Sequence, residues 1–145
     1  MLRGRASAKI DDKGRLKVPS GYRAIIEAEW GTGLYLTSLS SSGDSVRVYP
    51  MKVWESIEAG LRQLPSLHPA RKAFELTTSY WGQVAELDAQ GRVVIPPQLR
   101  EAAGASADVE VIGLQNCLEV WNSDRLRLKV ENVPLTDEHL VTLGI

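Results

Sequence analysis

The feature that most constrains this chain is an internal repeat. Residues 11–23 read DDKGRLKVPSGYR and residues 88–100 read DAQGRVVIPPQLR, with an offset of 77. The identical pairs are Asp11/Asp88, Gly14/Gly91, Arg15/Arg92, Pro19/Pro96 and Arg23/Arg100. A second match, with an offset of 72, relates residues 46–49 (VRVY) to residues 118–121 (LEVW). Each copy is therefore only about 45 residues long, too short to bury a core alone, and we expect the two copies to complete each other.

Each copy predicts a strand, a tight turn, a second strand and a short helix, followed by two further strands. An Asp at the first turn position accepts backbone N–H bonds and a Gly at the fourth tolerates a positive φ, so D-x-x-G indicates a hairpin. The strands are expected at residues 7–10, 15–18, 34–37 and 45–49, and again at 84–87, 92–95, 109–114 and 117–121, with Leu16, Val18, Val93 and Ile95 facing inward. The helices are expected at residues 22–29, 53–64, 70–80, 97–103 and 136–143. Residues 123–131 fit a strand or a helix, and alignment with the region around Trp54 favours the helix.

The charge of the chain is unevenly distributed. The net charge of −1, from 17 Lys and Arg against 18 Asp and Glu, at first argues against a nucleic-acid partner. Residues 1–25, however, carry seven basic and two acidic side chains, whereas residues 108–145 carry three basic and seven acidic ones. The neutral total therefore conceals a basic end that could bind an anionic partner.

Composition excludes several classes of protein. The single cysteine, Cys117, cannot form an internal disulfide, and together with His68 and His139 it provides too few ligands for a zinc site. The N-terminus lacks the apolar core of a signal peptide, and no apolar run approaches the roughly 20 residues that span a bilayer. We therefore expect a cytoplasmic protein with no metal, no cofactor, no small-molecule substrate and no membrane contact.

The arginine that follows each turn has two interpretations. Asp11 and Arg15 could form an ion pair that only stabilises the turn, which at an exposed site contributes about 0–1 kcal/mol. Alternatively the Asp orients the guanidinium outward, towards a phosphate or a guanine edge. The surroundings of the first turn favour the second interpretation, because they gather cations that are costly to hold together without an anion. These cations are Arg3, Arg5, Lys9, Lys13 and Lys17. The second turn has Glu86, Gln90 and Val94 at the matching positions, so the copies share a scaffold but differ in charge.

The order strand, D-x-x-G-R, strand, Pro and short amphipathic helix resembles the swapped-hairpin module of the AbrB/SpoVT class of bacterial transition-state regulators. Two such modules in a chain of this length, after the opening MLRG, resemble the MraZ family. Tyr49-Pro50 before Trp54-Glu55, and the LEVW of residues 118–121, match that family too. The resemblance implies a mixed, mainly β fold in which two tandem βαβ-hairpin modules form a pseudo-symmetric β-barrel. The implied divisions are module 1 at 5–52, a helical linker at 53–80, module 2 at 81–124 and a helical tail at 125–145.

The resemblance also implies a function. It points to a nucleoid-associated, DNA-binding transcriptional regulator, expected to be a repressor, that assembles into ring-shaped homo-oligomers and binds short direct repeats in the promoter of a division and cell-wall gene cluster. DNA contact by the D-x-x-x-R loops maps onto Arg15 and Arg92. Asp11 and Asp88 would orient them, on turns formed with Gly14 and Gly91. Arg23 and Arg100 match helix positions that are basic in the wider class, whereas Glu101 stands where single-module relatives often carry another arginine.

Two other functions are less well supported. An antitoxin of the AbrB type would carry one module and an extended acidic tail that wraps a toxin, but here the acidic end contains a strand pattern and Trp121. An aspartic-dyad hydrolase would need Asp-Thr/Ser-Gly, whereas here the Gly lies three residues after the Asp, and Arg15 and Arg92 would keep both carboxylates ionised. The chain is therefore not expected to be an enzyme. The four tryptophans, Trp30, Trp54, Trp81 and Trp121, are expected in core or subunit packing rather than in base stacking.

Overall fold

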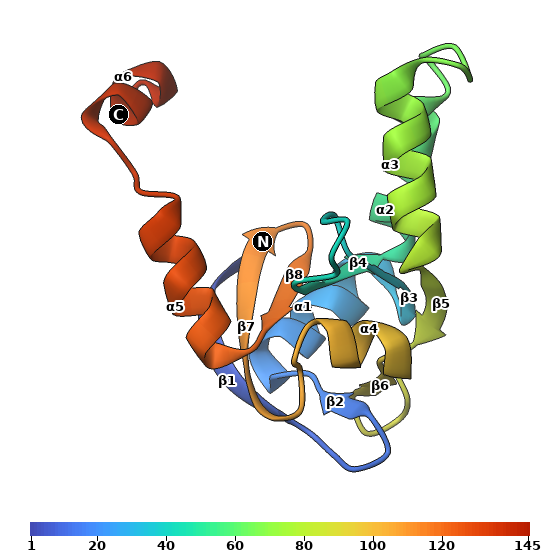
Figure 1. Ribbon diagram of the computed structural model, residues 1–145. Helices are drawn as coiled ribbons and strands as arrows, with labels where there is room; N and C mark the ends of the chain where they lie inside the picture. The colour runs from blue at the N-terminus through green and yellow to red at the C-terminus, as the bar shows by residue number, and fades with distance from the viewer.

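The computed structural model describes residues 1–145 and contains one antiparallel sheet of eight strands that curls into a nearly closed barrel (Figure 1). The strands are β1 (Leu2–Ile10), β2 (Arg15–Lys17), β3 (Gly33–Thr37), β4 (Val46–Pro50), β5 (Gln83–Glu86), β6 (Arg92–Val94), β7 (Ala107–Gln115) and β8 (Leu118–Trp121). The helices are α1 (Ser20–Trp30), α2 (Met51–Leu61), α3 (Pro69–Tyr80), α4 (Pro97–Ala102), α5 (Ser123–Asn132) and α6 (Asp137–Leu143). The expected mixed, mainly β fold class is confirmed.

The two repeats exchange their first strands. In the order β5-β3-β4-β8-β7-β1-β2-β6, β1 of the first repeat pairs with β7 of the second, and β5 of the second repeat pairs with β3 of the first. The β1–β7 ladder is long, running from Leu2 opposite Gln115 to Ile10 opposite Ala107. Each repeat therefore lacks a strand that only the other repeat supplies, which is why neither could bury a core alone.

A pseudo-twofold axis relates the repeats, and the strand register locates it. Leu16 on β2 lies opposite Val93 on β6, and these two residues are equivalent at the offset of 77. Arg47 on β4 lies opposite Glu119 on β8, and these are equivalent at the offset of 72. Because a residue that faces its own repeat equivalent lies beside the twofold axis, the axis passes through the β2–β6 pair and through the β4–β8 pair.

The barrel interior is the hydrophobic core. The four residues expected to face inward are all at most 1% exposed: Leu16, Val18, Val93 and Ile95. Helices α1 and α4 each follow a proline, which ends the preceding strand and leaves the helix to begin without a side-chain cap. They pack on the core through Tyr22, Ile26 and Leu99.

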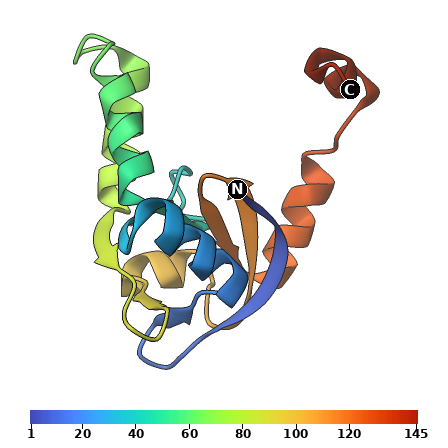
Figure 2. The ribbon, with the colours of Figure 1, turned by 180° about the vertical axis from the view of Figure 1, so that it is seen from behind.

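Helices α2 and α3 form a hairpin that projects from the barrel (Figures 1 and 2). Trp54 stacks on Tyr35 with ring centroids 4.5 Å apart and on Phe74 at 5.9 Å, so it joins the hairpin to β3. The expected packing role is confirmed for Trp54, Trp81 and Trp121, which are buried, and for Trp30, which is partly buried against the core.

Two strands extend beyond their expected bounds, and helix α2 (Met51–Leu61) begins and ends earlier than the expected 53–64. Strand β1 begins at Leu2 rather than at residue 7, and β7 begins at Ala107, because their mutual ladder extends both strands. Residues 123–132 form the helix that the alignment favoured, and Asn122 caps it by accepting the backbone N–H groups of Asp124 and Arg125.

Candidate nucleic-acid interface

The two D-x-x-x-R turns lie at the same end of the molecule. In both views of the ribbon, the β1–β2 and β5–β6 turns lie at the bottom, whereas the α2–α3 hairpin and helix α6 project from the top (Figures 1 and 2). The short β2–β6 ladder holds the strands after the turns together, with Arg15 opposite Val94 and Lys17 opposite Arg92. Residues opposite each other in an antiparallel pair point to the same face. Leu16 and Val93 point into the core, so these four side chains share the outer surface.

The first turn is built around the carboxylate of Asp11. Its Oδ1 accepts the backbone N–H groups of Lys13 at 3.0 Å and Arg15 at 2.9 Å, and its Oδ2 accepts the Nε–H of Arg15 at 2.6 Å. The bond from the Arg15 backbone N–H is the main cause that holds the pKa of Asp11 below its usual range, against the opposing effect of desolvation. Gly14 closes the turn with φ at +80°.

The second turn repeats this geometry. Asp88 Oδ1 accepts the backbone N–H groups of Gln90 at 2.8 Å and Arg92 at 2.9 Å, and Oδ2 accepts the Arg92 Nε–H at 3.1 Å. The pKa of Asp88 is also lowered, mainly by the backbone N–H of Arg92. Gly91 has φ at +75°.

The same geometry is therefore compatible with both interpretations of the arginines, as ion pairs that stabilise the turns and as guanidinium groups that face a partner. Each arginine forms an ion pair through Nε, while neither Nη1 nor Nη2 of Arg15 or Arg92 has a hydrogen-bond partner within the chain. The two side chains are 30% and 29% exposed. A guanidinium fixed at Nε presents its two terminal amino groups as a fork, which fits a phosphate or the O6 and N7 acceptors of guanine.

Arg23 and Arg100 pack under the turns of the opposite repeat. Arg23 on α1 donates from Nη2 to the carbonyl of Ala89 at 2.9 Å, and its Nε pairs with Glu27 at 3.0 Å. Its side chain lies where a Cβ on Gly91 would be, and the Arg100 guanidinium lies where a Cβ on Gly14 would be. Sequence reasoning places these arginines in DNA contact, and the structure gives them a second role as supports of the turns. The sequence shows the same Gly and Arg in each copy, but it does not show that the arginine of one copy packs against the turn glycine of the other copy.

The cations of β1 lie beside acidic residues of β7. Lys9 Nζ is 3.5 Å from Asp108 Oδ1, and Arg5 Nε is 4.0 Å from Glu110 Oε2. These acids reduce the positive potential along β1, which a count of residues 1–25 does not reveal. Arg3, Lys13 and Lys17 form no ion pair. Lys13 and Lys17 lie at the first turn, whereas Arg3 lies at the other end of β1, beside the N-terminus (Figure 1).

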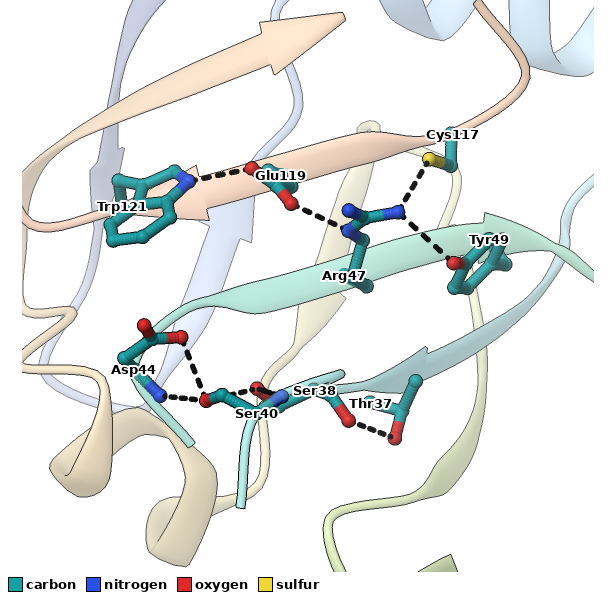
Figure 3. Close-up of polar contacts among 9 residues, drawn as sticks. All are labelled: Thr37, Ser38, Ser40, Asp44, Arg47, Tyr49, Cys117, Glu119 and Trp121. Carbon is teal, nitrogen blue, oxygen red and sulfur yellow. Dashed lines mark hydrogen bonds and ion pairs between the residues drawn. The ribbon is translucent and has the colours of Figure 1, made fainter. Parts of the chain in front are cut away.

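A second polar cluster lies at the β4–β8 end of the pseudo-twofold axis (Figure 3). Arg47 Nε is 2.6 Å from Glu119 Oε2, its Nη1 donates to the Tyr49 hydroxyl at 3.1 Å, and Trp121 Nε1 donates to Glu119 Oε1 at 2.8 Å. Burial raises the pKa of the neighbouring Cys117 thiol, so this cysteine is not a reactive thiolate. No buried side-chain nitrogen or oxygen of the chain lacks a hydrogen-bond partner, and we interpret this cluster as a structural lock between the repeats.

Comparisons with known proteins agree on one family. The model of the family described as "MraZ protein, putative antitoxin-like" matches residues 1–77 and 83–128. The transcriptional regulator MraZ of Koribacter versatilis (strain Ellin345) is 44% identical over 145 residues, covering 99% of this chain and 97% of that protein. Its counterpart from Acidobacterium capsulatum is 40% identical over 138 residues (95% and 93%), and that from Coxiella burnetii (strain RSA 493 / Nine Mile phase I) is 34% identical over 125 residues (86% and 82%).

No helix in the structure is long and apolar enough to cross a membrane. The duplicated turn, the exchanged strands and these matches lead to one conclusion: the chain belongs to the MraZ family, whose curated relatives are named as transcriptional regulators and not as enzymes.

Proposed function

We propose that this protein is a transcriptional regulator that binds double-stranded DNA with the end of the barrel that carries the two D-x-x-x-R turns. The observation that carries the proposal is the state of Arg15 and Arg92, each held at Nε by an aspartate and left with free terminal amino groups. Two such forks on one surface, with Lys17 opposite Arg92, form a site for acidic groups and base edges.

Within this surface, we assign different roles to different side chains. Lys13 and Lys17 form no ion pair and are suited to phosphates, which fix position without reading sequence. Arg3 also forms no ion pair, but it lies at the other end of β1, away from the turns. Arg15 is the first candidate for a guanine edge, because Lys13 of the same turn adds positive charge where the second turn has Gln90. Asp11 and Asp88 act as orienting groups, since a carboxylate that faced phosphate directly would be repelled.

The finer parts of the proposal rest on the resemblance to the family. They are a target in the promoter of the division and cell-wall gene cluster, recognition of short direct repeats, repression, association with the nucleoid and assembly into a ring-shaped homo-oligomer. One pair of turns offers few contacts, so we expect weak binding by a single subunit. Several subunits on a ring would bind repeated sites more tightly through effective concentration.

The test is fluorescence anisotropy with labelled DNA from upstream of the protein's own gene. We expect Arg15→Ala to weaken binding by about tenfold or more, the cost of one bidentate contact, and Arg92→Ala to weaken it less. The affinity is also measured over a series of salt concentrations. The slope of log affinity against log salt concentration should become shallower by about 0.9 for each phosphate contact removed, as in Lys13→Ala.

The controls separate the parts of the proposal. Arg127→Ala removes an exposed arginine of α5, away from the turns, and should leave affinity unchanged. Equal losses of affinity from Arg15→Ala and Arg92→Ala would refute the unequal roles of the two arginines, but would still support this surface as the DNA-binding one. Affinity that does not depend on salt, or that survives both substitutions together, would refute the surface itself.

A further inference from the structure

A cavity of about 240 Å³, which we call the hairpin cavity, lies between helices α2 and α3 where the hairpin meets the barrel. Side chains that follow one another at intervals of four form its two walls, as expected for the facing stripes of two helices. This volume is below the roughly 300–1,000 Å³ of sites for drug-sized ligands, so the cavity suits a smaller molecule. The side chains that the argument uses are Trp54, Glu58 and Arg62 along α2, Arg71 and Glu75 along α3, and Tyr35 on β3.

Trp54 brings an unused hydrogen-bond donor to the hairpin cavity. Its side chain is only 4% exposed, and its ring stacks on Tyr35 and on Phe74. Of the four indole N–H groups of the chain, only that of Trp121 has an acceptor within the chain. Because no buried side-chain nitrogen lacks a partner, the Nε1–H of Trp54 must be accessible, and it opens towards the cavity that Trp54 lines.

Arg71 provides a second donor to the same cavity. Its side chain is 18% exposed, its Nε is 3.3 Å from Glu75 Oε1, and its Nη1 donates to the Leu64 carbonyl at 2.7 Å. Nη2 has no acceptor within the chain. A guanidinium held at two of its nitrogens offers the remaining N–H groups in a fixed direction. With the indole N–H of Trp54, it favours an acceptor that has two oxygens, which is a carboxylate.

Glu58 and Arg62 line the cavity as charges without a partner. They are four residues apart along α2, a spacing at which Glu and a following cation commonly pair, yet neither forms an ion pair. After burial, the charge of Glu58 is the next cause that raises the pKa of Tyr35, so this carboxylate lies near the Tyr35 hydroxyl. That hydroxyl donates to the Thr78 carbonyl at 3.0 Å and is not available to Glu58. Glu58 therefore remains free for an ammonium group.

The charges around the cavity favour a ligand that carries both signs. Two arginines and two glutamates line it, so its formal charge is zero. A simple anion would be repelled by the free carboxylate of Glu58, and a simple cation by the free guanidinium groups, whereas a zwitterion complements both. Leu61 and the ring of Tyr35 provide an apolar part of the wall for a small side chain.

We propose that the hairpin cavity binds a free α-amino acid with a small apolar side chain, its carboxylate on Arg71 and the Trp54 N–H and its ammonium group on Glu58. This inference goes beyond the proposed function and does not rest on it, because the binding is measured without DNA. The α2–α3 hairpin projects away from the D-x-x-x-R turns, so the amino acid would not compete with DNA for them (Figures 1 and 2).

Isothermal titration calorimetry on the full chain tests the class of ligand. The probes are L-alanine, L-valine and L-leucine, each with one analogue that lacks the amino group and one that lacks the carboxylate, such as isovalerate and isobutylamine for L-valine. We expect at least one of the amino acids to bind, and both of its analogues to bind about tenfold more weakly or worse, since each loses a charge-assisted contact. An analogue that binds as tightly as its amino acid would overturn the proposal, as would the absence of binding by all three amino acids.

Substitutions and nuclear magnetic resonance test the position of the ligand. Glu58→Gln, at an exposed and unpaired position, should weaken binding about tenfold. Trp54→Phe keeps an aromatic ring in the stack but removes the indole N–H, and should weaken binding too. Glu55→Gln, at an exposed position of α2 outside the cavity, is the matched control and should bind as the wild type does.

The indole N–H signal that disappears in Trp54→Phe belongs to Trp54. In the wild type, the amino acid should shift this signal and leave that of Trp121, which is bonded to Glu119, in place. Wild-type affinity in Glu58→Gln would refute the proposal. A measured heat of binding without a shift of the Trp54 signal would place the ligand elsewhere and would also refute it.

Discussion

At the scale of single residues, each turn depends on a glycine that faces an arginine from the other repeat. Gly14 has φ at +80°, and its hydrogen occupies the place where a Cβ would collide with the guanidinium of Arg100. We expect Gly14→Ala to lower the free energy of unfolding by about 2 kcal/mol, from backbone strain and from displacement of Arg100. Gly21→Ala is the control, because Gly21 has open space around it and an ordinary φ, and it should change stability by less than about 0.5 kcal/mol. Urea denaturation measures both, and similar losses would contradict the contact with Arg100.

The turn aspartates also predict a dependence of stability on pH. The pKa values of Asp11 and Asp88 are lowered in the folded protein, so both groups bind fewer protons folded than unfolded near their usual value of 3.8. Their contribution is therefore present above about pH 4 and is lost as the pH falls through the lowered values. In Asp11→Asn with Asp88→Asn, the decline in stability below pH 4 should be shallower than in the wild type. Asp12→Asn, which removes an exposed carboxylate that forms none of these bonds, should retain the wild-type decline in urea titrations between pH 2.5 and 6.

At the scale of elements, the pair Arg47–Glu119 joins β4 to β8 where the repeats meet. Both side chains are less than one quarter exposed. We expect Arg47→Leu to destabilise the protein by about 3 kcal/mol, because Glu119 is left in a largely buried site without its cation. Arg47→Leu with Glu119→Leu should recover at least half of that loss, since no buried charge remains. A double-mutant cycle from urea denaturation gives the coupling, and additive losses would show that the pair does not join the strands.

The elements themselves were largely predictable, and their partners were not. The repeat predicted the strands, the turns and the inward positions such as Leu16 and Val93, because these depend on local spacing. It also settled the helix at 123–132, since α5 begins 72 residues after α2 as the second offset requires. The exchange of β1 and β5 between repeats was implied only by the resemblance to a swapped-hairpin module, and strand spacing alone could not predict it, because both repeats offer chemically similar edges. The salt bridge of Lys9 with Asp108 depends on that exchange, so the reduced charge along β1 could not be foreseen from the sequence.

At the scale of the whole molecule, the exchange of strands decides where the candidate site can form. Arg15 and Lys17 come from the first repeat, whereas Val94 and Arg92 come from the second, and the β2–β6 ladder sets them side by side. Arg100 supports the first turn from the second repeat. Neither repeat contains the complete candidate surface, so the duplication within one chain fixes both the fold and the candidate site.

This architecture predicts that the chain can be divided but that neither part folds alone as a monomer. A cut between Leu67 and His68, at the exposed tip of the α2–α3 hairpin, breaks no strand. Fragment 1–67 then lacks β5 and β7, the partners of β3 and β1, and fragment 68–145 lacks β3 and β1. Each fragment alone should show no cooperative unfolding as a monomer, because its exposed strand edges and half core cannot offset the chain entropy.

Mixing the fragments should restore the fold. We expect a 1:1 complex with the circular dichroism spectrum of the intact chain, detected by native mass spectrometry. The control is a cut between Asp12 and Lys13, within the first turn. This cut breaks the hydrogen bonds that Asp11 accepts from the backbone N–H groups of Lys13 and Arg15. We expect it to give a folded protein with weakened DNA binding. A fragment 1–67 that unfolds cooperatively as a monomer would mean that a single repeat can complete its own sheet. The fold of one repeat would then not require the strand exchange.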